Sequence, residues 1–463
     1  MTTDLLGKTL AGTFFHAPAL GAIEVLKDAL VEIDVAGRIA AVRRSGDTGH
    51  ADARIAASRA GNLVMLSDGC YVIPGFVDLH IHAPQYPQLG KALDVPLEIW
   101  LQRHTFPLEA RYADAAFARR VYEALVADLL ANGTTTALYF ATIHQEATRL
   151  LVDTCLEQGQ RALVGKVAMD NAQQCPDFYR DASTEAGLEG TRSLIDYVRA
   201  HPQNGGGLVH PVVTPRFLPS CTDPMLEGLG AIAGSYGCHV QTHCSESDWA
   251  HGYALSRHGV TDAECLDRFG LLTRRSILLH SNLITEADMA RIAARGAGVA
   301  HCPLSNAYFA HAVFPLRAAL ERGLRVGLGT DISGAPSASM LDACRMAVAA
   351  SCMLEDGVDP ALPPDRRGRP SSRIGVRDAF HLATAAGGDA LDLPVGRFEP
   401  GCYFDAILVD TDAPRGTIRL FHELDAPEDV LAKIVYTASR ANLATIWVGG
   451  RRIAGVPPWS SAQ

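Results

Sequence analysis

The sequence predicts an α/β fold, in which a (β/α)8 TIM barrel carries a small β-sandwich formed by the N- and C-terminal segments. Three observations support this prediction. Short β-rich runs alternate with amphipathic helical runs from residue 75 to about residue 390. The alternation provides eight strand candidates, the number that a closed parallel barrel needs. Both ends of the chain, in contrast, contain strand-like runs and few helix signals.

The eight strand candidates are short and apolar. They occupy residues 76–82, 134–140, 162–169, 208–214, 239–243, 276–280, 298–302 and 325–329. A doubly wound open sheet is the alternative for such an alternation. That fold usually has a Gly-rich dinucleotide loop after its first strand, but here the turn is HAPQYPQLG. The barrel is therefore preferred.

Two of the intervening helices have clear boundaries. Residues 114–133 repeat apolar residues at every fourth position, which places them on one helix face: Phe117, Val121, Leu125 and Leu129. We expect this helix to end at Asn132-Gly133, a typical C-cap. The next helix is expected over 145–158, ending at Gly159.

The flanking segments predict strands. Residues 25–43 indicate a hairpin around Ala36-Gly37, and residues 444–455 indicate two strands joined at Gly449-Gly450. We therefore expect the barrel to be inserted between the two halves of the sandwich. The expected domains are 1–73 for the N-terminal part of the sandwich, 74–395 for the metal-dependent catalytic barrel, and 396–463 for the C-terminal part.

Composition narrows the class of protein. The chain of 463 residues is 48% hydrophobic and 20% charged, which is typical of a folded globular protein. Its net charge of −10 and the absence of a dense Lys/Arg run disfavour a nucleic-acid partner. The most basic stretch, DRRGRP at 365–370, is interpreted as a solvated loop.

The eleven cysteines are scattered and form no CxxC pair, which indicates reduced thiols. The first residues lack the features of a signal peptide. No apolar run approaches the roughly 18–20 residues of a transmembrane helix. We expect a soluble, cytoplasmic protein without a membrane partner.

Chemistry-bearing residues recur at the strand ends, where reacting groups lie in this fold. His80 and His82 are two apart on the first strand, so their side chains share one face about 7 Å apart. The fourth strand runs into Arg216 and Phe217. The fifth and sixth strands end at His243 and His280, and the eighth leads to Asp331. A second carboxylate, Glu246, follows three residues after His243.

Each residue alone has an ordinary structural interpretation. A single histidine is more often a core residue than a ligand, Glu246 suits a helix N-terminus, and Asp331 suits a turn. Their joint occurrence on several strand ends makes coincidence hard to sustain. Six other histidines lack such placement and are interpreted as structural: His16, His50, His104, His201, His251 and His258.

Imidazoles and a carboxylate that converge on one rim predict a mononuclear catalytic Zn²⁺ site, with Fe²⁺ or Mn²⁺ as the alternative. A metal ion lowers the pKa of bound water toward about 7, which supplies a nucleophile at neutral pH. Asp331 would contact the metal and accept the proton of the water. Glu246 would carry that proton to a ring nitrogen of the substrate.

The motifs together resemble the amidohydrolase superfamily in its mononuclear zinc deaminase branch, and within it the guanine deaminases. The resemblance covers nearly the whole chain and rests on these stretches: PGFVDLHIHAPQYPQLG, NGTTTALYFATIH, GKVAMD, VTPRF, QTHCSE, AHCPLSN and GLGTDISGAPSASML. HxH alone is weak, but HAPQ joined to VTPRF and HxSE is specific. No lysine suited to bridge two metals stands at the fourth strand.

The resemblance implies a role for each matching residue. The implied zinc ligands are His80, His82, His243 and Asp331; the implied proton shuttle is Glu246; His280 would orient the attacking water; Gln85, Arg216 and Phe217 would hold the purine. It further implies hydrolytic deamination of guanine at C2, giving xanthine and ammonia, by a homodimer. An Arg or Gln amide can donate to the O6 and N7 acceptors of guanine.

Two loops depart from the family pattern. AYFAHAVF at 307–314 includes Tyr308, Phe309 and His311 where small residues are usual, and ISGAPS follows Asp331 where glycines are usual. Deamination of a related aminated heterocycle (a pterin, 8-oxoguanine or an aminotriazine) therefore remains an alternative. A non-catalytic scaffold of this fold is disfavoured because every expected ligand is present. A nucleic-acid deaminase is disfavoured by the acidic charge and by the lack of its H-x-E…P-C-x-x-C pattern.

Overall fold

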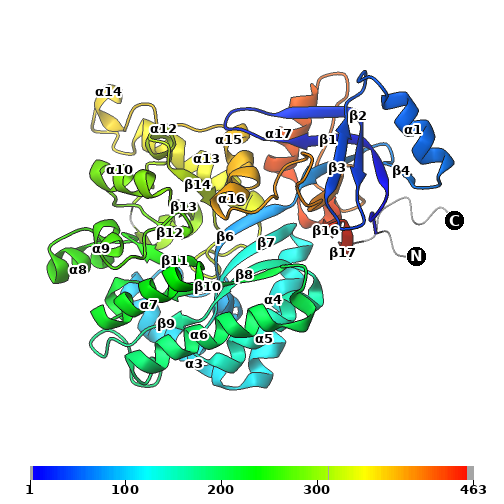
Figure 1. Cartoon of the computed structure of the whole chain (residues 1–463). Coiled ribbons are helices and arrows are strands. Elements are labelled where there is room, and N and C mark those ends of the chain that lie inside the picture. Colours follow the sequence, from blue (N-terminus) through cyan, green and yellow to red (C-terminus); the bar gives the residue numbers. More distant parts are fainter. Residues whose placement is uncertain (1–3, 311, 456–463) are drawn as a thin grey trace.

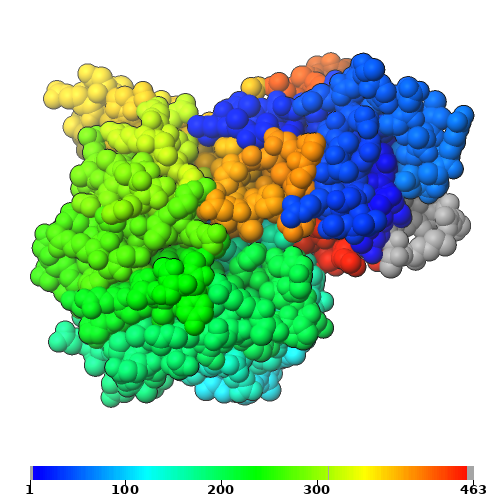
Figure 2. All heavy atoms as spheres, in the orientation of Figure 1, coloured from blue at the N-terminus to red at the C-terminus, as the bar shows by residue number. Residues whose placement is uncertain are grey.

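The structure has two parts, a barrel and a β-sheet domain assembled from both ends of the chain (Figure 1). It is a computed structural model and describes residues 4–310 and 312–455. The blue N-terminal atoms pack beside orange and red C-terminal atoms on one side of the molecule (Figure 2). The predicted separation into a barrel and a domain built from the termini is therefore confirmed.

The barrel contains eight parallel strands in the order in which they occur in the chain. They are β6 (Phe76–His82), β7 (Thr134–Phe140), β8 (Arg161–Gly165), β10 (Val209–Pro215), β11 (His239–Cys244), β12 (Ser276–His280), β13 (Gly298–His301) and β14 (Arg325–Leu328). The segment after β14 reaches β6, because Ile332 bridges Ile81 and accepts a hydrogen bond from the His82 amide over 2.8 Å. This contact nearly closes the barrel, as the strand count predicts.

One predicted strand is divided. The run 162–169 forms β8 and the short β9 (Val167–Ala168), with Lys166 between them. Lys166 is buried and its Nζ donates to Asp181 Oδ1 over 2.7 Å and to the carbonyl of Val167 over 3.0 Å. A buried ammonium needs such partners, and Lys166 has them at the break between the two strands.

Helices surround the barrel, and some of the shorter ones lie at its mouth or project from it (Figure 1). Those of the first half are α2 (Leu97–Trp100), α3 (Phe106–Ala110), α4 (Ala115–Ala131), α5 (Gln145–Gln158), α6 (Thr184–Ala200) and α7 (Asp223–Tyr236). Those of the second half are α8 (Asp248–His258), α9 (Asp262–Arg268), α10 (Glu286–Arg295), α11 (Pro303–Ser305), α12 (Leu316–Glu321), α13 (Met340–Asp356), α14 (Pro364–Arg367), α15 (Val376–Leu382) and α16 (Ala385–Ala390).

The helix boundaries follow the sequence signals. Asp114 caps α4 by accepting hydrogen bonds from the amides of Ala116 and Phe117, and Asn132 is the C-cap. The apolar face of α4 is buried, as the four-residue spacing of its apolar residues predicts. The next helix, α5, ends at Gly159, whose φ of 74° is the left-handed conformation that favours glycine.

The terminal domain is one eight-stranded sheet. Its strands are β1 (Thr9–His16), β2 (Glu24–Ile33), β3 (Ile39–Arg43), β4 (Leu63–Met65), β5 (Cys70–Pro74), β15 (Ala406–Asp410), β16 (Leu443–Val448) and β17 (Arg451–Gly455). Both predicted hairpins, β2–β3 and β16–β17, are present. The helices of this domain are α1 (His50–Arg59) and α17 (Pro427–Thr437).

A buried ion pair joins the two parts. Arg161, at the start of β8, donates through Nε and Nη2 to the carboxylate of Asp405, over 3.0 and 3.3 Å. Both residues are 2% exposed. The pair lies at the N-terminal ends of the strands, the end of the barrel that contributes to stability rather than to chemistry.

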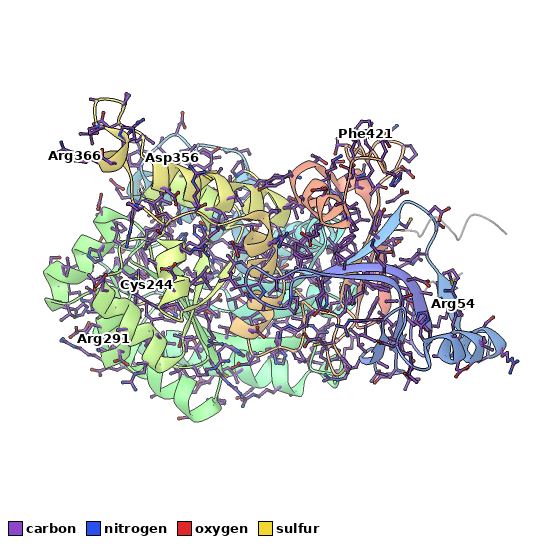
Figure 3. The ribbon with its side chains drawn as sticks, turned by 90° about the horizontal axis from the view of Figure 1, so that it is seen from above. Arg54, Cys244, Arg291, Asp356, Arg366 and Phe421 are labelled. Carbon is purple, nitrogen blue, oxygen red and sulfur yellow. The ribbon has the colours of Figure 1, made fainter. Side chains whose placement is uncertain are left out.

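The basic stretch 365–370 lies apart from the barrel interior. Arg366 is exposed at the end of a projecting segment, whereas Cys244 is buried in the barrel (Figure 3). All eleven cysteines are free thiols, and ten of them are buried. None of the helices in the described residues has the length and apolar character needed to cross a membrane.

Candidate metal and purine site

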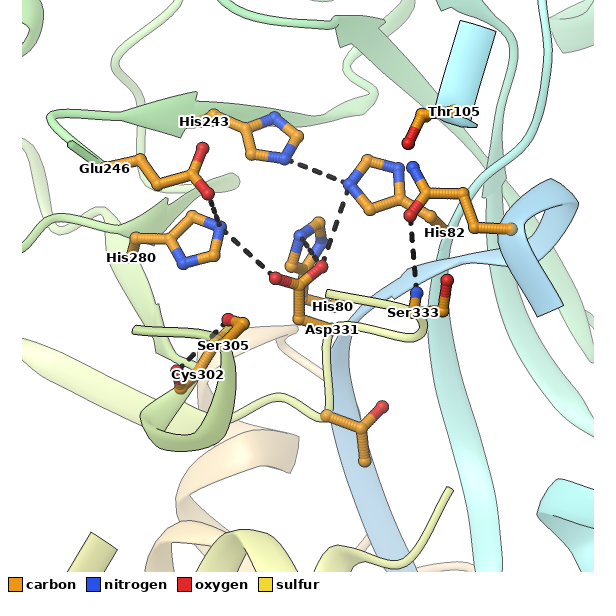
Figure 4. A network of polar contacts seen from close by, with 12 residues as sticks. His80, His82, Thr105, His243, Glu246, His280, Cys302, Ser305, Asp331 and Ser333 are labelled. Atoms are coloured by element: carbon orange, nitrogen blue, oxygen red, sulfur yellow. Dashed lines mark hydrogen bonds and ion pairs between the residues drawn. The ribbon is translucent and has the colours of Figure 1, made fainter. Parts of the chain in front are cut away.

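The C-terminal ends of the barrel strands bring six predicted residues together. His80 and His82 come from β6, His243 from β11 and His280 from β12, while Glu246 and Asp331 follow β11 and β14. Their side chains face one another across the barrel mouth (Figure 4). All six are buried, with exposures between 0% and 8%.

The backbone at this rim is strained. Within the described part of the chain, four of the eight non-glycine residues with positive φ lie here: Ser245, His280, Ser281 and Asp331. Such conformations persist only where surrounding structure enforces them, and they concentrate at functional sites. The Asp331 amide donates to the His80 carbonyl over 2.8 Å, which holds the turn after β14 against β6.

The donor atoms lie at separations suited to one metal ion. His82 Nε2 is 3.0 Å from His243 Nε2 and 3.8 Å from Asp331 Oδ1, and His80 Nε2 is 3.1 Å from the same oxygen. Ligands about 2.1 Å from a tetrahedral Zn²⁺ are separated by about 3.4 Å. The three histidines have ring nitrogens within 4.8 Å of one another, and so do His80, His280 and Asp331.

Hydrogen bonds fix the orientation of two imidazoles. His243 Nδ1 lies 2.7 Å from the Arg216 carbonyl oxygen, and His280 Nδ1 lies 2.9 Å from Asn306 Oδ1. Each acceptor requires an N–H on Nδ1, so Nε2 carries the lone pair in the neutral ring. Asn282 supports the second contact by donating to the same Asn306 oxygen over 3.1 Å.

Several ring nitrogens are buried without a hydrogen-bond partner. Across residues 4–310 and 312–455, these include both nitrogens of His80, Nδ1 of His82 and Nε2 of His280. Burial also lowers the pKa of His80, His82 and His243, so the rings are neutral lone-pair donors near pH 7. Unpaired buried polar atoms are costly unless a ligand satisfies them. This donor set fits a divalent metal ion.

The two carboxylates have opposite tendencies. Burial raises the pKa of Glu246. Burial alone would also raise the pKa of Asp331, but its electrostatic and hydrogen-bonding interactions with the surrounding imidazoles, His80 foremost, hold that pKa well below its usual range. Glu246 Oε1 lies 3.6 Å from His280 Nε2, which is itself 3.8 Å from Asp331 Oδ2. Asp331 is thus suited to be ionised at neutral pH, and Glu246 is suited to carry a proton.

A cavity opens directly beside this cluster. It encloses about 390 Å³, including its mouth. Predicted metal ligands and predicted purine-binding residues both line it. Its polar lining includes His82, Gln85, Arg216, His243, Glu246 and Asp331; its apolar lining includes Leu97, Trp100, Leu101, Phe217 and Phe309. The three residues predicted to hold a purine therefore share one space with the histidine–carboxylate cluster.

Comparison with known proteins agrees with this geometry. Residues 71–453 match the profile of the Amidohydrolase family. That range contains all eight barrel strands and every residue of the cluster. The chain belongs to the amidohydrolase family.

Several amidohydrolases are similar to this chain over nearly all of its length. The chain is 36% identical to a probable guanine deaminase of Schizosaccharomyces pombe, covering 96% of this chain and 83% of that protein. It is 34% identical to a guanine deaminase of Homo sapiens, covering 99% and 98%. A solved guanine deaminase from C. acetobutylicum, with guanine bound in its active site, superposes with a TM-score of 0.85 at 28% identity, covering 96% of this chain and 100% of that one.

The amidohydrolase site includes residues that sequence reasoning missed. Glu109 in α3 is fully buried and binds both Arg216 and Gln85, and Asn306 binds His280. Glu109 follows no strand, so a search of strand ends passes over it. Asn306 stands in the quoted AHCPLSN stretch, a few residues past the seventh strand, and that stretch was the available signal.

The unusual loop after β13 lies partly at the cavity. Phe309 lines the cavity and packs on Trp100 with ring centroids 5.0 Å apart, whereas Tyr308 is 41% exposed. His311 lies outside the described residues. The 307–314 loop of this amidohydrolase therefore contributes one apolar wall through Phe309.

Proposed function

We propose that this amidohydrolase deaminates guanine by hydrolysis, giving xanthine and ammonia. One observation carries the proposal: the histidine–carboxylate cluster and the Arg216–Gln85–Phe217 wall line the same cavity. The identities of 34–36% to guanine deaminases over nearly the full chain support it. Hydrolysis replaces the C2–N bond of the exocyclic amine by a C2–O bond, and ammonia carries away the second water proton.

The metal would be held by His80, His82, His243 and Asp331. Nitrogen-rich donor sets of this kind favour Zn²⁺, with Fe²⁺ or Mn²⁺ as the alternative. The bound metal would supply Lewis acidity that makes water a nucleophile near neutral pH. The unpartnered nitrogens of His80 and the 3.1 Å approach of Asp331 Oδ1 to its ring support this assignment.

The protein groups would divide the proton transfers. Asp331, whose pKa is held low, is ionised before the attack and then accepts a proton from the attacking water. His280, with Nδ1 committed to Asn306, offers Nε2 to orient that water. Glu246, whose pKa is raised by burial, delivers a proton to a ring nitrogen beside C2.

The purine would be held by the remaining wall. Arg216 and Gln85 donate to O6 and N7, and Phe217 packs on the ring face. Arg216 thereby also stabilises the negative charge that develops on the ring during attack. Phe217 is 6% exposed and lines the cavity, consistent with such packing.

Ammonia release by the purified protein tests the proposal. Guanine, 8-oxoguanine and a pterin are compared side by side, with metal content measured on the same sample. Rapid release from guanine with about one zinc per chain is the expected result. Release only from another ring would transfer the function to that heterocycle and implicate the wall formed by Trp100 and Phe309.

Two further expectations belong to the proposal. A homodimer is expected from the resemblance to guanine deaminases, and the native mass from light scattering tests it. A cytoplasmic location is supported by eleven free cysteines, which suit a reducing compartment. Fractionation of the source cells with an antibody to the protein tests that location.

A further inference from the structure

Glu109 forms a buried link between the two polar residues of the purine wall. Its Oε2 accepts a hydrogen bond from Arg216 Nη1 over 2.6 Å, and its Oε1 accepts from Arg216 Nη2 over 3.2 Å. Oε1 also accepts from Gln85 Nε2 over 2.9 Å. Glu109 is 0% exposed and does not line the cavity, so it acts through its two neighbours.

The carboxylate determines how Gln85 is turned. An ionised carboxylate only accepts hydrogen bonds, so the amide nitrogen of Gln85 must face Glu109. The amide oxygen then faces the backbone N–H of Ser333 at 3.3 Å, a group that only donates. Both neighbours demand the same orientation. The carbonyl of Gln85 is therefore engaged, and its second N–H remains for the cavity.

Arg216 is constrained in the same sense. A guanidinium has five N–H donors and no acceptor, and two of these donors are bound to Glu109. The negative charge of Glu109 also compensates the buried positive charge of Arg216, which is 2% exposed. Gln85 and Arg216 together present hydrogen-bond donors to the cavity, and the one acceptor atom of the pair, Gln85 Oε1, is held by the Ser333 N–H.

We propose that Glu109 is a positioning residue that makes this wall donor-only and thereby selects purines with an oxygen at C6 over purines with an amine at C6. The inference rests on the proposed function and deepens it. An O6 atom can receive the N–H groups of Arg216 and Gln85. A 6-amino group would direct its own N–H bonds at them and leave buried donors unpaired, which sites of this kind reject strongly.

Glu109→Gln is the decisive variant. The new amide can donate to Gln85, so the Gln85 amide can flip. Its oxygen then takes the place of the nitrogen that faces both residue 109 and the cavity. We expect the KM for guanine to rise by about 10-fold or more, since a lost charge-assisted contact costs roughly that much. The ratio of kcat/KM for guanine over 2,6-diaminopurine should fall by at least about 10-fold for the same reason, with products identified by chromatography.

A purely structural role for Glu109 predicts a different result. Asp405→Asn breaks another buried ion pair, the one between Asp405 and Arg161 at the opposite end of the barrel. We expect that control to lose thermal stability while keeping the wild-type ratio between the two purines. Glu109→Asp keeps the charge on a shorter side chain, so its ratio should lie between those of the wild type and Glu109→Gln.

Equilibrium binding separates this inference from the proposed function. Hypoxanthine and adenine, which lack the 2-amino group, are titrated calorimetrically into wild type and Glu109→Gln with equal metal content. The inference is supported if wild type binds hypoxanthine more tightly than adenine and Glu109→Gln loses this preference, even if the protein does not turn over guanine. An unchanged preference in a folded Glu109→Gln, or in Glu109→Asp should Glu109→Gln fail to fold, overturns it.

Discussion

The Nδ1–H of His243 donates to the backbone carbonyl of Arg216 over 2.7 Å. A predicted metal ligand is thus oriented by the residue whose side chain lines the purine wall. The contact uses the backbone of Arg216, while its guanidinium binds Glu109. Side-chain changes at Arg216 should therefore affect purine binding without disturbing the metal.

Arg216→Lys is predicted to raise the KM for guanine more than it lowers kcat, with metal content unchanged. Lysine keeps a positive charge but loses the planar fork that pairs with Glu109. Arg216→Ala should raise KM further and also cost about 3–5 kcal/mol of stability, because it leaves a buried carboxylate unpaired. Steady-state kinetics with elemental analysis test this. An unchanged KM would remove Arg216 from recognition.

His82→Ala and Asp331→Ala are each predicted to abolish metal-dependent turnover. Both side chains contribute donor atoms to the cluster at 3.8 Å from each other. Loss of activity should exceed about 100-fold, the upper range for residues that only support a ligand, and bound metal should fall below one per chain. His422→Ala, at an exposed histidine, is the matched control. Near-normal activity of Asp331→Ala would contradict the proposed mechanism.

Asn306→Leu is predicted to lower kcat with little change in KM. Its Oδ1 accepts from His280 Nδ1 over 2.9 Å and so fixes which ring nitrogen faces the water. Loss of such an orienting contact typically costs about 10–100-fold. Metal content should remain that of the wild type, since Asn306 hydrogen-bonds to none of the four proposed metal ligands. A change confined to KM would assign Asn306 to purine binding instead.

Metal removal is predicted to lower the melting temperature reversibly. The buried histidine nitrogens without partners in the described structure would then have no ligand to satisfy them. Returning Zn²⁺ at 1,000 times its Kd should stabilise the protein by about 4 kcal/mol. Differential scanning calorimetry before and after dialysis with a chelator measures this. His82→Ala should respond much less, and an equal response would place the metal elsewhere.

His239 is predicted to make stability depend on pH far from the site. Burial lowers its pKa to about 4, and its Nε2 lies 3.0 Å from the Leu391 carbonyl oxygen. Between pH 6.5 and 4 the unfolded chain binds a proton that the folded chain excludes, so stability falls as pH falls. The difference is worth up to about 3 kcal/mol at 1.4 kcal/mol per unit.

His239→Gln should flatten this dependence, because glutamine does not titrate in that range. Urea unfolding of the variant and of wild type at pH 7 and pH 4.5 gives the comparison, and metal release at low pH cancels between them. His422→Gln, at an exposed position, should leave the dependence as it is in wild type. Parallel curves for His239→Gln and wild type would exclude His239 as the cause.

Much of the fold could be predicted because its signals are local. Apolar periodicity defined α4, glycines marked its end and that of α5, and β-rich runs located all eight barrel strands. The division of 162–169 could not be predicted in the same way. The residue at the break, Lys166, is buried against Asp181, a tertiary partner that no local pattern specifies.

The sequence by itself determined which chemical groups stand at the strand ends. A period of two residues puts His80 and His82 on one face of β6, and parallel strands of a barrel deliver their ends to one rim. Residue type and position then suffice to predict a histidine–carboxylate cluster with Gln85, Arg216 and Phe217 nearby.

Only the tertiary structure decided how those groups are paired and charged. Glu109 meets Arg216 across 107 positions in the chain, and the His243 tautomer depends on a carbonyl from a neighbouring strand. The opposite tendencies of Glu246 and Asp331 arise from burial and from the distances to His280 and His80. Hydrogen bonding and electrostatics act through space at a few ångströms, so they follow from packing and not from order along the chain.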